Sequence, residues 1–279
     1  MLLVNSLFLS PDVSHWLANT HRPRILHIFD RACNLINEQG DVLSLVTPQI
    51  GNGPFNLVLE EKIHFPEHLT LDSPISISTT LIKLGDLTIH TTEAKLWHPR
   101  PDWEMLHTKA DEILDRVKQL PITNYLNRSD LPIPQSLISS LSAALVHLDI
   151  STATSSASQL AGLGIGLTPS GDDFIMGALY AVWIIHPPEV ASVFAREIVN
   201  TAAPLTTSLS AAWLKAAGRG EAGIVWHEFL DALVSSDPSK IEKTLKNILA
   251  VGETSGEDAL AGFMGVFEAL MKKAGSLHG

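Results

Sequence analysis

The stretch that organises this chain reads Gly162-Leu163-Gly164-Ile165-Gly166-Leu167-Thr168-Pro169-Ser170-Gly171-Asp172-Asp173, and an apolar run from Phe174 to Ile185 follows it directly. Alternating glycines leave the backbone free to adopt positive φ or to let another group approach closely. Pro169 favours an extended Thr168, and Ser170 with Asp173 three positions on matches a helix capping box. We therefore expect a glycine loop that leads into a buried helix with two carboxylates in its first turn.

Part of this pattern occurs again near the C-terminus, where Thr254-Ser255-Gly256-Glu257-Asp258 precedes a second apolar segment. In both copies the order Ser-Gly-acid-Asp is followed, after three residues, by a glycine, Gly177 or Gly262. Residues four apart lie on one face of a helix, and a glycine there allows a neighbouring helix to approach closely. We expect the two helices to cross at these glycines and to bring both loops into one cleft.

The composition is that of a globular protein with a substantial core. The chain has 279 residues, of which 45% are hydrophobic and 18% charged. Its formal net charge of −11, without a basic cluster in the sequence, argues against nucleic acid and anionic membranes as partners. The single cysteine, Cys33, excludes an internal disulfide framework. The apolar start of the chain lacks the features of a signal peptide, and no apolar run reaches the ~20 residues of a membrane span. We expect a soluble, cytoplasmic protein.

The first part of the chain, from residue 24 to about 98, has the pattern of β-strands. Short apolar segments alternate with turn residues, and Asn37 to Asp41 is expected to close a hairpin. A second hairpin is expected around Gly85-Asp86. We expect about six strands in this part.

Beyond residue 100 the apolar period becomes helical, beginning with one helix from Trp103 to Val117. Residues 120–134 are expected to form a connection, after which Gln135 to Leu148 and a polar stretch from Asp149 to Ser158 lead to the glycine loop. Further helices are expected at about 173–186, 189–203, 205–218, 222–235, 238–250 and 256–274. The prediction is an α+β fold, with a β-rich domain over residues 1–100 packed on an all-helical domain over residues 101–279.

The paired acidic motifs have two interpretations, of which the simpler is that they only cap two helices. A cap needs one oxygen acceptor, however, and it does not require the upstream glycines or a second near-copy. Carboxylates in a first helical turn are favoured by the helix dipole, so we expect lowered pKa values and ionised acceptors. Such acids could hold a divalent cation such as Mg²⁺ or the NH₂ group of an amide-like substrate. The backbone N–H groups of the loop could receive an anion.

The segment Gly164 to Phe174 resembles a motif of the AllH-type family. The resemblance extends to Phe29 to Leu35, Asn52-Gly53-Pro54, Thr207 to Ala211, and Gly252 to Asp258, and so spans nearly the whole chain. Members of that family include a subunit of the oxamate carbamoyltransferase of allantoin and purine catabolism. That enzyme converts oxalurate and phosphate to oxamate and carbamoyl phosphate, together with two other subunits. The resemblance therefore implies a carbamoyltransferase subunit with a small-molecule substrate and two partner subunits.

Two hypotheses about function remain open. The chain is either an enzyme subunit for carbamoyl or acyl transfer, or a non-catalytic ligand-binding or scaffold subunit whose partners supply the chemistry. For the first, the candidate catalytic residues are Asp172, Asp173 and Asp258, and a metal could also involve Glu257. The candidate substrate-binding residues are Gly164, Gly166, Thr168, Ser170, Gly171, Thr254, Ser255, Gly256, Asn52 and Ser208.

Overall fold

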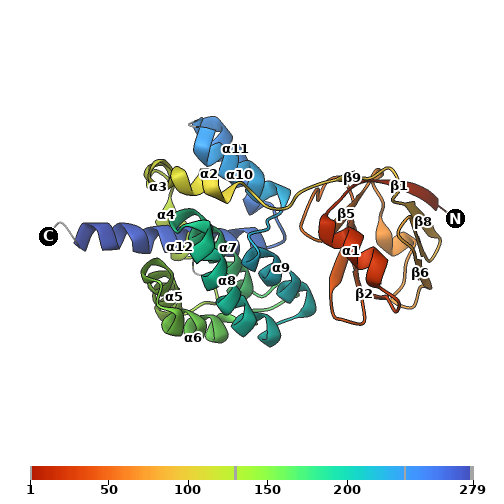
Figure 1. The fold of residues 1–279 in the computed structure, drawn as a ribbon, viewed down its shortest axis with the longest axis horizontal. Coiled ribbons are helices and arrows are strands. Elements are labelled where there is room, and N and C mark those ends of the chain that lie inside the picture. The colour runs from red at the N-terminus through yellow and green to blue at the C-terminus, as the bar shows by residue number, and fades with distance from the viewer. Residues whose placement is uncertain (1, 129–130, 236, 277–279) are drawn as a thin grey trace. The chain divides into compact units, whose positions relative to one another are not determined.

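A computed structural model describes residues 2–128, 131–235 and 237–276. The chain divides into two units, which we describe separately (Figure 1). The first comprises Met1–Pro99 with the short segment Ala222–Ile224, and the second comprises Arg100–Glu221 with Val225–Gly279. Ile224 joins the first unit through its backbone N–H, which donates to the carbonyl of Asn52 at 2.9 Å. The sequence contained no sign of this brief return of the chain.

The first unit is a nine-stranded sheet that curves round on itself (Figure 1). The strands follow the spatial order β2-β3-β4-β5-β1-β8-β7-β6, and β9 also pairs with β1. Their bounds are β1 Leu2–Leu9, β2 Arg24–Ile28, β3 Ala32–Ile36, β4 Val42–Val46, β5 Asn56–Leu59, β6 Ile75–Ile77, β7 Leu81–Leu84, β8 Leu87–His90 and β9 Lys95–Leu96.

Both expected hairpins are confirmed. The first joins β3 to β4, and Asn37 donates its N–H to the Asp41 carbonyl at 3.0 Å. The second joins β7 to β8 across Gly85, whose φ of +56° suits a glycine. The expected count of six strands for residues 24–98 was too low, because eight strands, β2 to β9, lie there. The apolar N-terminus adds a ninth strand, β1. This strand pairs with β5, β8 and β9 and therefore holds the middle of the sheet.

The core of the first unit lies between the sheet and a short helix, α1 (Pro11–Asn19). Ser10 caps this helix by accepting from the Val13 N–H. Val13, Trp16 and Leu17 are buried on the face that meets the sheet. The Trp16 indole donates to the Asp41 carbonyl at 2.9 Å, which ties α1 to the β3–β4 hairpin. A single-turn helix, η1 (Phe65–Glu67), completes this unit.

The second unit is helical throughout, so the predicted α+β class is confirmed. Among the described residues, no helix is both long enough and apolar enough to cross a bilayer. The helices are α2 Trp103–Thr108, α3 Ala110–Val117, α4 Ile122–Leu126, α5 Gln135–His147, α6 Ile150–Leu160, α7 Ser170–Ile185, α8 Pro188–Ala202, η2 Ala203–Leu205, α9 Ser208–Gly218, α10 Ile224–Ser235, α11 Pro238–Leu249 and α12 Ser255–Ser276.

Three expectations for this part were wrong in detail. The helix expected from Trp103 to Val117 is broken at Lys109 into α2 and α3. The expected connection contains a short helix, α4. The polar stretch after residue 149 is α6, because Asp149 caps it and three alanine or serine side chains, Ala153, Ser156 and Ala157, are small enough to bury one face. Their low hydrophobicity concealed this helix in the sequence.

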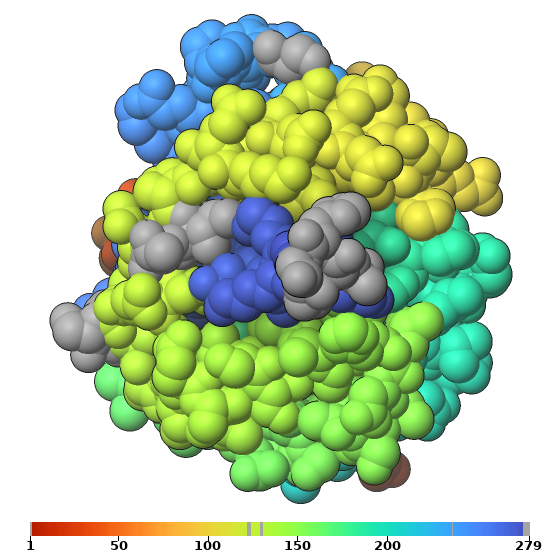
Figure 2. Space-filling view, turned by 90° about the vertical axis from the view of Figure 1, so that its left-hand side faces the viewer, coloured from red at the N-terminus to blue at the C-terminus, as the bar shows by residue number. Residues whose placement is uncertain are grey.

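Helix α7 is the centre of the second unit. Fourteen of its residues, Ser170 to Ile175 and Gly177 to Ile184, are buried, and most of them are apolar, as expected for a helix at the centre of a core. Its most extensive contact is with α12. Figure 2 shows the later part of α12, in blue, lying between the yellow α2–α4 region and the green α5–α6 region. The two helices that carry the acidic motifs therefore form the core of this unit.

Candidate functional site

Helices α7 and α12 cross where the sequence placed the two glycines. A side chain at Gly177 would come within 1.7 Å of the Ala259 carbonyl oxygen, and one at Gly262 within 1.9 Å of the Phe174 carbonyl oxygen. Ala259 and Phe174 occupy the same position in their motifs, one residue after Asp258 and Asp173. The crossing is thus reciprocal, and it confirms the prediction that the glycines let the two helices approach.

The likeness of the two copies extends back into the preceding helices. A side chain at Gly171 would meet the Leu160 carbonyl of α6, and one at Gly256 would meet the Ile248 carbonyl of α11. The N–H groups of Gly171 and Gly256 donate to the carbonyls of Leu163 and Val251, at 2.8 and 3.0 Å. Helices α6 and α7 therefore repeat the arrangement of α11 and α12, with a longer loop in the first copy. The sequence predicted both motifs and the helix before the second one, α11, but not the helix before the first one, α6.

The two loops touch directly. The hydroxyl oxygens of Thr168 and Ser255 are 2.8 Å apart and form a hydrogen bond. One comes from the loop before α7, and the other is the first residue of α12. This contact places Asp173 and Asp258 in one site.

Asp173 and Asp258 form a buried carboxyl pair, with 4% and 0% of each residue exposed. Among the described residues, Oδ2 of Asp173 and Oδ2 of Asp258 have no hydrogen-bond partner, and Oδ1 of Asp258 has only an ion-pair contact with Arg128 at 3.0 Å. Burial, together with the charges of Asp258 and Asp172, raises the pKa of Asp173 well above its usual range, although the Ser255 and Thr168 hydroxyls oppose the shift. The expected lowering of this pKa was wrong, because loss of hydration outweighs the helix dipole.

Arg128 is a member of the site that sequence reasoning missed. Its guanidinium lies 3.0 Å from Asp258 Oδ1 and 3.0 Å from Glu257 Oε2. The Arg128 side chain is only 10% exposed, whereas that of Glu257 is 39% exposed. Arg128 follows α4 in a stretch that reads as a connection, and neither its spacing nor its neighbours pointed to α12. It supplies the positive charge beside an otherwise acidic centre.

Asp172 differs from Asp173 because both of its carboxyl oxygens accept hydrogen bonds from other parts of the protein. Oδ1 accepts from the Gly162 N–H at 3.0 Å, and Oδ2 accepts from the hydroxyls of Ser210, at 2.8 Å, and of Thr206. Asp172 thus connects the start of the glycine loop to the start of α9. Thr206 and Ser210 lie on either side of Ser208, the candidate substrate-binding residue of this segment. Ser208 is exposed at the start of α9.

The expected capping box is not formed. Helix α7 begins at Ser170 itself, its N-cap is Pro169, and no side chain caps it. Ser170 is buried against Gly164, whose φ of +121° and close approach to the Ser170 N–H both require glycine. Thr254 accepts, through its carbonyl, from the Asp258 N–H at 2.9 Å. The serine that begins each helix therefore supports the loop and does not act as a helix cap.

The tip of the glycine loop faces solvent. Gly166 has a φ of +92° with open space where a side chain would be, and Ile165 is 95% exposed. Thr207, the N-cap of α9, donates its hydroxyl to the Leu167 carbonyl at 2.6 Å and holds the second half of the loop. The remaining predicted site residue, Asn52, is half-buried in the first unit and is described with that unit.

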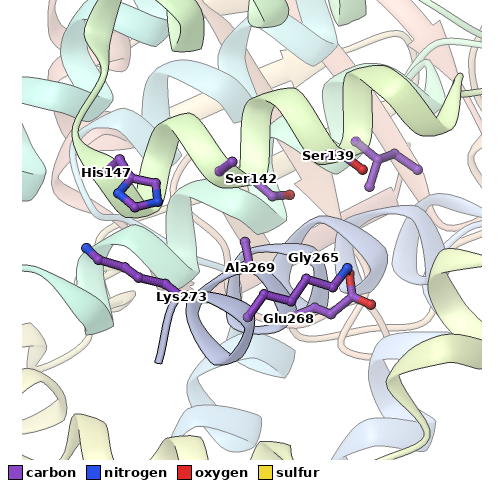
Figure 3. A pocket seen from close by; sticks show the side chains of 10 residues that line it. Ser139, Ser142, His147, Gly265, Glu268, Ala269 and Lys273 are labelled. Atoms are coloured by element: carbon purple, nitrogen blue, oxygen red, sulfur yellow. The ribbon is translucent and has the colours of Figure 1, made fainter. Parts of the chain in front are cut away.

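Within the residues that the structure describes, no group of three or more His, Cys, Asp or Glu side chains is placed to hold a metal ion. The Mg²⁺ site stays a prediction. A pocket of about 330 Å³ lies further along α12, between that helix and α5 (Figure 3). Its polar lining includes His147, Glu268 and Lys273, but Lys273 donates to the Val146 carbonyl and Glu268 pairs with Lys272 at 2.9 Å. This pocket is separate from the acid pair.

The geometry defines an α+β protein whose helical unit contains a duplicated loop–helix motif around two buried acids. Comparison with protein families then identifies it: residues 6–96 match the model of the AllH family N-terminal domain, and residues 160–267 match that of oxamate carbamoyltransferase subunit AllH. The chain belongs to the AllH family. A search of the solved structures found no match. The second match begins at the last residue of α6 and ends within α12, so it contains both acidic motifs.

Proposed function

We propose that this chain is the subunit of an oxamate carbamoyltransferase that binds and activates the carbamoyl donor, oxalurate, at the Asp173–Asp258 pair. Its family membership supplies the reaction. The observation that supports the site is that Oδ2 of Asp173 and Oδ2 of Asp258 are buried and have no hydrogen-bond partner among the described residues. Buried polar atoms in proteins are nearly always hydrogen-bonded, so two such oxygens in one place favour a ligand that forms hydrogen bonds. The ureido end of oxalurate carries N–H donors of this kind.

The reaction also needs a proton. Hydrogen phosphate attacks the carbamoyl carbon, the bond from that carbon to the oxamate nitrogen breaks, and the leaving nitrogen takes up a proton. Asp173 is suited to give this proton, because its raised pKa keeps the carboxyl protonated at higher pH than an ordinary aspartate. The proton of hydrogen phosphate restores Asp173, so the step balances. Asp258, paired with Arg128, accepts from the NH₂ group.

The remaining residues position this pair. Asp172 holds the glycine loop to α9, and Thr168 and Ser255 join the two loops. Among the described residues, Arg128 is the basic side chain that contacts the acid pair, and it is engaged by Asp258 and Glu257. We infer that partner subunits contribute to binding of the phosphate, in agreement with the subunit description of the family.

The test is turnover of oxalurate and phosphate by the assembled complex, with Asp173→Asn and Asp258→Asn compared with wild type. Asparagine has nearly the same shape but has no carboxyl proton to give, so turnover should fall by about tenfold or more while the complex still assembles. Asp231→Asn, at an exposed position of α10, is the matched control and should leave turnover unchanged. Full turnover in either acid variant would overturn the proposal and favour a scaffold role for this chain.

A further inference from the structure

A second pocket of the helical unit gathers basic side chains that are far apart in the sequence. It has a volume of about 530 Å³, within the range of small-molecule sites, and α7, α8, α9 and the segments before α2 and after α9 contribute to it. Its charged lining residues are four cations, Arg100, Arg196, Lys215 and Arg219, and one acid, Glu221. The whole chain has 19 basic against 30 acidic residues, so this local excess of positive charge is opposite to the net charge.

Part of this pocket is held rigidly. The Arg100 guanidinium lies over the buried Trp183 ring, 4.9 Å from its centroid, and donates to the Arg219 carbonyl at 2.9 Å. The Trp183 indole is fixed in turn by its hydrogen bond to the Ala217 carbonyl at 3.0 Å. A guanidinium has five N–H groups, so Arg100 keeps donors for a ligand. Because the Trp183 ring and the Arg219 carbonyl already restrain the Arg100 side chain, that side chain loses less conformational entropy when a ligand binds.

The cations differ in how far the protein already neutralises them. Arg219 forms a two-fold hydrogen bond with Glu221, at 3.1 and 2.6 Å. Arg196 has only a long contact with Glu197, at 3.7 Å. Within the described ranges, neither Arg100 nor Lys215 forms an ion pair. The pocket therefore has positive charge in excess of what its own carboxylate balances. The pocket of Figure 3 has a smaller excess of positive charge, because it is lined by two lysines, Lys272 and Lys273, and one carboxylate, Glu268, which pairs with Lys272 at 2.9 Å.

We propose that this pocket binds the phosphate group of a small molecule. Arginine guanidinium groups match phosphate in geometry and charge, and a lysine adds a mobile point charge. Trp183 lies ten positions after Asp173 on α7, which places the pocket about 15 Å along the helix from the acid pair. One small substrate does not span that distance, so the pocket is a site of its own. It goes beyond the proposed function and does not depend on the identity of the carbamoyl donor.

The experiment is calorimetric titration of the full chain with inorganic phosphate. The variant is Arg196→Gln with Lys215→Gln, two exposed side chains whose replacement leaves the contact between Arg100 and Trp183 in place. Phosphate affinity should fall by about tenfold or more. Lys246→Gln, an exposed cation paired with Glu242 on α11, is the charge-matched control and should bind as wild type does. Asp173→Asn should also bind phosphate normally, which separates this site from the acid pair.

Turnover of the assembled complex tests whether the pocket is separate from the acid pair. An unchanged KM for phosphate in the double variant, with binding lost in the titration, would support a separate site for a phosphorylated small molecule. A raised KM for phosphate would mean that the pocket serves the reaction itself and would overturn the separate site. Wild-type protein that takes up no phosphate, or a double variant with wild-type affinity, would overturn the proposal. A circular dichroism spectrum and a melting curve for each variant confirm that it is folded.

Discussion

The two loop–helix copies share a backbone arrangement and differ in what they do with their acids. In both, a glycine near the start of the helix packs on the preceding helix and a second glycine packs on the other copy. In the first copy, however, the acid before the aspartate, Asp172, is buried and held by three donors. In the second copy the corresponding Glu257 is partly exposed and faces Arg128. The glycines that both copies share allow the two helices to cross, and the acids that differ, Asp172 and Glu257, make the site asymmetric.

The asymmetry has a consequence for the proton that the proposed reaction requires. The two aspartates are close enough for the charge of Asp258 to raise the pKa of Asp173. Arg128 lies on the Asp258 side of the pair. Asp258 is therefore next to the positive charge of Arg128, whereas Asp173 is next to the hydroxyls of Ser255 and Thr168 and the negative charge of Asp258. Such a pair separates the roles of proton donor and hydrogen-bond acceptor.

The largest expected effect on stability comes from replacing the crossing glycines that both copies share, Gly177 and Gly262. Gly177→Ala and Gly262→Ala each place a methyl group against a carbonyl oxygen of the other helix, so the helices must separate. We expect each to lower the free energy of unfolding by more than about 3 kcal/mol, measured by urea denaturation. The control is Gly275→Ala in α12, where a methyl group meets nothing within 4 Å. It should leave stability unchanged or raise it slightly. Equal stability of all three variants would contradict the crossing.

A smaller effect should separate Asp172 from Glu257. Asp172→Ala leaves the Gly162 N–H and the Thr206 and Ser210 hydroxyls without their acceptor, so we expect a loss of about 2–3 kcal/mol in unfolding free energy. Glu257→Ala removes a partly exposed partner of Arg128, which keeps Asp258, and should cost less than about 1 kcal/mol. Equal losses of unfolding free energy in the two variants, measured by urea denaturation, would contradict the difference between Asp172 and Glu257.

The smallest expected effect is the pH dependence of stability due to Asp173. A carboxyl whose pKa is raised on folding binds its proton more tightly in the folded state, so its contribution is fully present below the pKa of an unfolded aspartate, about 3.9. It is lost as the pH rises through the folded pKa, by at most about 1.4 kcal/mol per pH unit. Denaturation of wild type and Asp173→Asn over a pH series measures the difference. Parallel curves for the two proteins would show that Asp173 has an ordinary pKa.

Much of the fold could be predicted from local patterns. The β3–β4 and β7–β8 hairpins follow from their turn residues, and the helices after residue 170 follow from apolar periodicity and from prolines and glycines at their ends. The errors lie where local pattern and burial disagree. The strand β1 resembles an unstructured apolar start until its partners β5, β8 and β9 are known, and α6 buries residues too small and polar to mark a helix.

The paired motif, the glycines of the crossing and the two aspartates could be predicted from the chain itself, because a repeated order of residue types is visible without any contact. Which carboxyl oxygens accept hydrogen bonds depends on the three-dimensional contacts. Asp172 and Asp173 are adjacent in the chain, yet Asp172 accepts three hydrogen bonds, whereas Oδ2 of Asp173 has no hydrogen-bond partner among the described residues. Successive helix positions point in different directions, and the partners Arg128, Thr206 and Ser210 come from distant segments. The pKa of Asp173 likewise follows from burial, which no local pattern records.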